Sequence, residues 1–294
     1  MSDELLVAGS IALDSLDGEF GSVREEMGGS ALYFALAASL IMPVRMVAPV
    51  GQESLATVKQ ILGSRPIDIE YLDVLDAPTY RWRARQESGR NIDRGSQDSI
   101  YDRWKPRVPA GYQGWAFVGS MRPDRQAVLT IELEHSSLLA ADAMLSYLQS
   151  QPEEARDVLR RSRWYFCNHE EFAALGGHEP DDFRRRWSLD GLVVKAGPRG
   201  VTAYTERGST HVPALPSQRV VDTTGAGDAI AAGMMARWID VGADPELLQE
   251  SLVWGVACAS ITISDIGLRA IAAATHDQLH DRVEEVDRCL RRES

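Results

Sequence analysis

Short apolar runs alternate with longer amphipathic segments along most of this chain. Buried strands are predicted at residues 5–8, 44–50, 67–72, 115–118, 128–133, 164–167 and 192–195. Helices are predicted between them, at residues 31–41, 53–62, 141–148, 153–161 and 181–187. Strands that alternate with helices are typical of a mostly parallel sheet covered by helices on both faces. The pattern therefore predicts an α/β fold.

One segment departs from this rhythm. Residues 79–86 alternate strictly, so Tyr80, Trp82 and Ala84 would face one way and Arg81, Arg83 and Arg85 the other. The polar residues 88–102 follow without helical periodicity. We predict that residues 13–25 and 77–108 form a small β-sheet outside a main domain of residues 1–12, 26–76 and 109–294. An ordinary edge hairpin of the main sheet is the alternative.

Composition narrows the class of protein. The 294 residues carry 43 acidic and 31 basic side chains, a formal net charge of -12. An acidic surface repels phosphate backbones, so no nucleic-acid partner is expected. The most apolar stretch, 31–44, is too short to cross a bilayer, and the first residues do not resemble a signal peptide. We therefore expect a cytoplasmic protein with no membrane partner.

Cysteine usage gives no sign of a disulfide framework or a zinc site. The chain has three cysteines, Cys167, Cys258 and Cys289, and no Cys-x-x-Cys pair.

The segment 222–228 carries the most informative chemistry. It reads Asp-Thr-Thr-Gly-Ala-Gly-Asp and precedes the apolar helical segment 229–236. Small residues at a helix start let main-chain N–H groups approach an anion, and the helix dipole adds positive potential. A phosphate is the expected guest. We expect Asp228 to stay ionised there and to accept a proton from an attacking hydroxyl. Simple capping by an acidic helix start is the alternative.

This string resembles the C-terminal signature of the ribokinase-like (PfkB) carbohydrate kinases. Other matches occur in family order: Gly9-Ser10-Ile11 with Asp14, Gly28-Gly29-Ser30-Ala31, Asn168 with Glu171, and Lys195 through Gly200. They span nearly the whole chain. The resemblance implies a ribokinase-like, Rossmann-type, mostly parallel sheet with a small β-sheet lid. It also implies an ATP-dependent phosphotransferase that uses Mg²⁺ and an alcohol group as acceptor.

The resemblance also implies a role for each matching residue. Asp228 would be the catalytic base, and Gly225, Ala226 and Gly227 the anion hole. The acceptor would be bound by Asp14, Gly28, Gly29 and Tyr33. The nucleotide side would comprise Asn168, Glu171, Lys195, Gly197, Gly200 and Thr223, with Glu171 holding Mg²⁺ through water. A helix-capping box is an alternative for Asn168 and Glu171. Lys195 and Arg199 would touch the nucleotide phosphates, and a solvated surface charge is the alternative for each.

Two departures from the family pattern affect the expected substrate and ions. Tyr33 stands where the family usually has asparagine, which favours a polyol such as inositol, a modified sugar or a nucleoside over plain ribose. Asp222 and the Thr224 carbonyl are candidate ligands for a monovalent cation. The residues after Gly267 lack the serine of cation-activated members, so potassium dependence is doubtful.

Several alternatives stay open at this level. The expected acceptor is a small sugar or polyol. The rivals are a nucleoside kinase of the same fold and a catalytically inactive regulator that binds sugar or nucleotide. Lids of this kind pair between subunits or stand alone, so a homodimer through the lid is neither required nor excluded.

Overall fold

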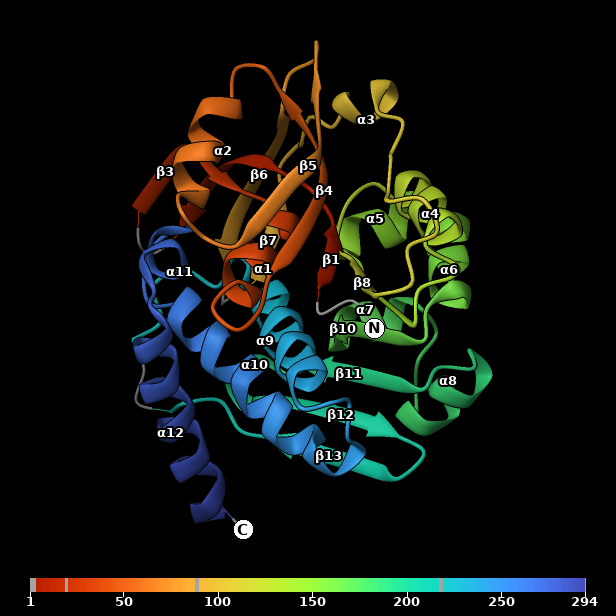
Figure 1. Ribbon diagram of the computed structural model, residues 1–294, viewed down its shortest axis with the longest axis vertical. Helices are drawn as coiled ribbons and strands as arrows, with labels where there is room; N and C mark the ends of the chain where they lie inside the picture. The colour runs from red at the N-terminus through yellow and green to blue at the C-terminus, as the bar shows by residue number, and fades with distance from the viewer. Residues whose placement is uncertain (1–3, 19–20, 88–89, 217–218, 294) are drawn as a thin grey trace.

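The computed structural model describes residues 4–293 except 19–20, 88–89 and 217–218. Its main sheet has nine strands in the order β13-β12-β11-β10-β9-β8-β1-β4-β5 (Figure 1). In chain order the strands are β1 (Leu5–Ala8), β4 (Val44–Gly51), β5 (Ile67–Leu75), β8 (Trp115–Val118), β9 (Leu138–Asp142), β10 (Trp164–Asn168), β11 (Gly191–Lys195), β12 (Val201–Thr205) and β13 (Gly208–Val212).

All neighbouring strands from β5 through β11 run parallel, and β12 and β13 extend that edge antiparallel. The carboxyl ends of the parallel strands therefore meet at one edge of the sheet, where α/β folds bind their ligands.

Helices cover both faces of the main sheet, as the apolar runs predict. One face packs against α1 (Ser30–Ala38), α2 (Leu55–Leu62), α9 (Ala226–Asp240), α10 (Leu248–Thr262), α11 (Arg269–Ala273) and α12 (His276–Glu293). The other packs against α3 (Ile100–Arg103), α4 (Pro123–Glu132), α5 (Leu145–Ser150), α6 (Pro152–Arg161), α7 (His169–Ala174) and α8 (Pro180–Arg186). Leu5 and Val7 of β1 join the first core, and Leu6 and Ala8 join the second. Within the described residues, no helix is long and apolar enough to span a membrane.

A second, four-stranded sheet has the order β3-β2-β6-β7. Its strands are β2 (Ala12–Gly18), β3 (Gly21–Gly28), β6 (Tyr80–Glu87) and β7 (Arg90–Asp93). In β6, Tyr80 and Ala84 are buried while Arg83 and Arg85 are exposed, as the alternation predicts. The strands form a separate sheet, so the edge-hairpin alternative is wrong. The division of the chain at 13–25 and 77–108 stays a prediction.

Two predicted elements are wrong. Residues 128–133 belong to α4 and the turn after it, not to a strand. Pro123 begins the helix, and buried Gln126, Leu129, Thr130 and Leu133 follow a helical spacing that overrides the local preference of β-branched residues for strands. The strand is β9, which contains the first residues of the helix predicted at 141–148. That helix begins only at Leu145.

Candidate active site

The residues predicted to form the acceptor side lie where β1 ends and α1 begins. The Ser10 N–H donates to Ser30 Oγ, and the Ser30 N–H donates to Ser10 Oγ, each over 3.0 Å. Gly29 between these segments has φ +101°, and a Cβ there would collide with the Ser10 carbonyl. The close approach therefore requires glycine at position 29.

Asp14 on β2 lies directly against Gly28. A Cβ at position 28 would overlap the Asp14 carboxylate. Asp14 is 4% exposed, and its Oδ1 has no hydrogen-bond partner among the residues that the structure describes. Burial, and then repulsion from Asp222, raise the pKa of Asp14 to about 8. A buried carboxylate oxygen without a donor is rare in folded proteins and is typical of functional positions.

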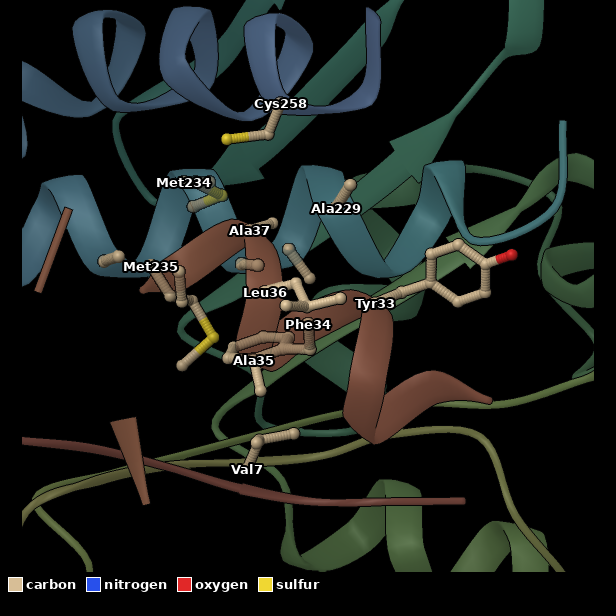
Figure 2. Packing of buried hydrophobic residues seen from close by; sticks show 14 of the residues in the cluster. Val7, Tyr33, Phe34, Ala35, Leu36, Ala37, Ala229, Met234, Met235 and Cys258 are labelled. Carbon is tan, nitrogen blue, oxygen red and sulfur yellow. The ribbon is translucent and has the colours of Figure 1, made fainter. Parts of the chain in front are cut away.

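Tyr33 lies between this acceptor side and the start of α9. Its ring packs against Gly225, which has φ +75° and whose Cβ, if present, would collide with that ring. In Figure 2 the Tyr33 side chain extends from α1, with its hydroxyl away from Met234 and Met235. Within the described chain that hydroxyl has no hydrogen-bond partner. Tyr33 therefore supports the turn at Gly225 with its ring and leaves its hydroxyl buried beside acidic groups.

Asp222 joins two loops. Its Oδ1 accepts hydrogen bonds from the Thr224 N–H (2.9 Å) and hydroxyl (2.7 Å), and its Oδ2 accepts one from the Gly267 N–H (3.0 Å). Both carboxylate oxygens are thus engaged by the protein. The described part of the chain contains no cluster of three or more His, Cys, Asp or Glu side chains that could hold a metal. A monovalent-cation site at Asp222 stays a doubtful prediction.

Asn168 and Glu171 form the capping box that their spacing allowed. Asn168 Oδ1 accepts from the N–H groups of Glu170 and Glu171 at 2.9 Å, and Glu171 Oε2 accepts from the Asn168 N–H at 2.8 Å. The box fixes the orientation of the buried Glu171 carboxylate. Burial raises the pKa of Glu171 to about 7, against the opposing effect of Lys195.

The Lys195 side chain is only 13% exposed and forms an ion pair, so the surface-charge alternative is wrong for this residue. Its Nζ lies 3.5 Å from Asp142 Oδ2, and a Cβ at Gly227 would be only 2.7 Å from that Nζ. Burial opposes the charged form, but Asp142, Glu171 and Asp228 outweigh it and raise the pKa of Lys195. The ammonium group therefore lies beside the Gly-Ala-Gly turn at the start of α9.

Asp142 is a site residue that the sequence reasoning missed. It ends β9, next to the end of β10, and is 3% exposed. Burial raises its pKa, while Lys195 lowers it. The available signal was a carboxylate directly after the apolar run of residues 138–141. The signal was missed because the sequence pattern predicted a helix over residues 141–148.

Asp228 occupies the first turn of α9, and its Oδ1 is another buried oxygen without a partner in the described residues. Burial, followed by repulsion from Asp142, raises its pKa well above the usual range, although Lys195 opposes the shift. This direction opposes the expected ionisation of Asp228 in the protein without ligands, and the charge state of Asp228 stays a prediction. The helix dipole and one ammonium group do not compensate for desolvation beside two other carboxylates.

The other predicted nucleotide-side residues are more dispersed. Gly200 has φ +89°, and its missing side chain lets the turn after β11 approach the Val212 carbonyl. Gly197 begins the same turn, the 3₁₀ segment η1 (Gly197–Arg199). The Thr223 hydroxyl accepts a hydrogen bond from Gln86 Nε2 at 3.0 Å, a contact that the sequence did not reveal. Two open hollows, of about 490 and 540 Å³, lie on the small sheet and touch neither Lys195 nor Asp228.

The amino-acid sequence is similar to those of known kinases. The pfkB family carbohydrate kinase profile matches residues 122–274. A nucleoside kinase of Methanocaldococcus jannaschii is 28% identical over 152 residues, 51% of this chain and 48% of that protein. An ATP-dependent ribose-1-phosphate kinase of Halopiger xanaduensis is 26% identical over 275 residues, 89% of each chain. The alignment thus spans about half of the first relative and most of the second.

A solved structure shows the same fold at low identity. Burkholderia thailandensis nucleoside kinase in complex with ADP-inosine superposes with a TM-score of 0.77 and 20% sequence identity, covering 96% of this chain and 95% of that chain. The architecture of a mostly parallel sheet, flanking helices and a small second sheet is therefore the ribokinase-like one predicted from the sequence.

Proposed function

This chain belongs to the pfkB family of carbohydrate kinases, and we propose that it transfers the γ-phosphoryl group of ATP to a hydroxyl of a small sugar, polyol or nucleoside, with Asp228 as the base. The observation that carries the proposal is the unpartnered Asp228 Oδ1 at the start of α9, with the Lys195 ammonium beside Gly227 in the same turn. A proton acceptor and positive potential converge there, which is what phosphoryl transfer requires.

The two sides of the site divide the work. Asp14 offers a free carboxylate oxygen to acceptor hydroxyls, and Gly28 and Gly29 leave room for the Asp14 carboxylate and the Ser10 carbonyl to approach the start of α1. The amides of Gly225 to Gly227 and the Lys195 ammonium would stabilise charge on the transferred phosphoryl group. The small sheet that carries Asp14 would act as a lid that excludes water from this space.

Magnesium and ATP fit the residues on the nucleotide side. Asp142 Oδ1 is a buried oxygen without a partner in the described structure, and Glu171 is held nearby by its capping box. Carboxylate oxygens are the protein ligands that Mg²⁺ prefers, often through water. Bound magnesium would supply positive charge that favours the ionised forms of these acids. Asn168 and Glu171 would orient that shell, and Thr223 would lie at its edge.

A nucleoside is the second candidate acceptor, because an aromatic side chain lies beside Asp14. Asp14 pairs with Trp82 in the parallel ladder of β2 and β6, so these two side chains share a face of the small sheet. In the described residues, Trp82 Nε1 is a buried donor without a partner. An unpaired donor on a flat ring suits a heteroaromatic base better than a polyol.

A coupled assay of ADP release tests the proposal across fructose, ribose, ribose 1-phosphate, myo-inositol, inosine, cytidine and uridine. We expect acceptor-dependent ADP formation with at least one of these compounds. Binding of ADP and an acceptor without any transfer would instead favour the inactive-regulator alternative. A product analysis of the active acceptor identifies the phosphorylated hydroxyl.

A further inference from the structure

A side chain of the small sheet reaches the loop that precedes the anion hole. Gln86, near the end of β6, donates from Nε2 to the Thr223 hydroxyl over 3.0 Å, and the contact is partly buried. Thr223 stands two residues before Gly225 and next to Asp222. The small sheet and the phosphate-side loop are therefore joined although 137 positions separate the two residues.

A second contact joins the small sheet to the main domain. Glu26 on β3 pairs with Arg269 at the start of α11, with Oε1 and Nη2 2.6 Å apart. Both side chains are about half exposed, so the pair by itself contributes little. Its position matters more, because Arg269 follows Gly267 by two residues.

Asp222 connects these two contact points. It is 1% exposed and binds the Thr224 N–H and hydroxyl with one oxygen and the Gly267 N–H with the other. The loop at Thr223 and the loop at Gly267 therefore form one unit, and the small sheet touches that unit at both ends. Movement of the sheet away from the main domain would break both contacts to this unit.

We propose that Gln86 is a positioning residue that couples the small sheet to the anion hole through Thr223. The role of the loop in holding a phosphoryl group rests on the proposed function, but the coupling itself rests on the contacts above. Asp14 lies on the same small sheet as Gln86, so an acceptor held by Asp14 and a nucleotide held at Gly225 to Gly227 both bias one contact. When both ligands favour the state in which this contact is made, linkage makes each favour the binding of the other by the same factor.

Amide hydrogen exchange of the ligand-free protein tests the coupling directly. We expect Gln86→Ala to speed exchange about two- to tenfold in β6 and also in residues 220–228, the loss expected for one hydrogen bond. Thr223→Val should have the same two-site effect, and the double variant should add little to either single change. Thr223→Ser keeps the hydroxyl and should restore wild-type exchange. Arg83→Ala, on the outward side of β6, is the matched control and should leave residues 220–228 unchanged.

A second arm uses Mg·ADP as the probe. In the wild type, Mg·ADP should slow exchange in residues 222–228 and in β6; in Gln86→Ala it should slow exchange in residues 222–228 alone. Faster exchange confined to β6 in ligand-free Gln86→Ala would overturn the coupling. Failure of Mg·ADP to protect residues 222–228 of the wild type would count against the proposed function instead, and the ligand-free comparison would still decide the coupling.

Discussion

The Lys195 ammonium lies against Gly227. A Cβ at position 227 would be only 2.7 Å from Lys195 Nζ. Lys195 ends β11, and Gly227 belongs to the first turn of α9. A formal positive charge and the positive end of a helix dipole therefore meet at one point. The positive charge of Lys195 lowers the pKa of three neighbouring acids, Asp142, Glu171 and Asp228.

Replacing Lys195 with methionine should shift the pH dependence of catalysis. Without the ammonium group, the pKa of Asp228 rises further, so the acidic limb of the profile of kcat against pH moves to higher pH. Turnover at pH 7 should fall about 100-fold or more, as for loss of one donor to the transition state. Arg207→Met, which removes an exposed positive charge between β12 and β13, is the control and should keep the profile. If the acidic limb of the profile does not move in Lys195→Met, the charge of Lys195 does not affect the ionisation of the catalytic base.

Gly227→Ala should harm turnover through the same contact. The added methyl group must displace the Lys195 ammonium, so kcat should fall in the wild-type background. In the Lys195→Met background the same change should cost much less, because the two residues are in contact and their effects are not additive. Steady-state kinetics of the wild type, the two single variants and the double variant measure these losses. Equal losses of kcat in the two backgrounds would show that the methyl group does not act through Lys195.

Asp228→Asn should remove turnover while preserving nucleotide binding. Loss of a general base typically costs about 10²- to 10⁴-fold in rate. ATP affinity, measured by calorimetry, should stay within a few-fold, because the asparagine keeps the shape of the side chain. Asp240→Asn at the other end of α9 provides a matched control and should retain activity. Substantial turnover in Asp228→Asn would refute the assignment of the base.

The free energy of unfolding of the unliganded protein should fall as pH rises, because folded Asp14 holds a proton that unfolded Asp14 has lost. Its pKa is about 8 when folded and about 4 in an unfolded chain, so the folded state holds the proton through that window. The resulting stabilisation is present below about pH 4 and is lost as the pH rises through 8. Asp14→Asn should reduce the decline in unfolding free energy between pH 5 and pH 8 by at most about 4 kcal/mol, measured by urea denaturation.

The decline should not vanish in Asp14→Asn, because burial also raises the pKa values of Glu171 and Asp228. The same variant should weaken acceptor use, since it replaces the ionised form that accepts two hydroxyl hydrogens. An identical pH slope in the variant and the wild type would contradict the burial of this acid.

Arg65 should contribute to stability without touching the site. Its guanidinium donates to the carbonyls of Ile271 (3.0 Å), Ala272 (3.2 Å) and Ala274 (2.7 Å) at the end of α11. Arg65→Ala would leave these carbonyls without that donor and should cost about 2–4 kcal/mol. Arg185→Ala, which removes an exposed ion pair with Asp182, should cost less than about 1 kcal/mol. Thermal and urea unfolding of both variants give the comparison.

Local patterns predicted much of the fold because both faces of the main sheet are buried. The apolar run at 115–118 matches β8 residue for residue, and the alternation in 79–86 identifies β6 and its outward arginines. The segment 128–133 shows the limit of such patterns. Its β-branched residues favour a strand, yet the burial of Leu129 and Leu133 within a helical spacing decides the outcome.

The sequence by itself determined the strand–helix order, the Gly-Ala-Gly turn before α9 and the residues that resemble kinase motifs, because each of these depends on neighbours along the chain. Only the tertiary structure decided the direction in which burial shifts the pKa of Asp228, the ion pair of Lys195 with Asp142, and the contact of Gln86 with Thr223. Burial and electrostatic fields arise from residues far apart in sequence, which a parallel sheet brings together at the ends of its strands.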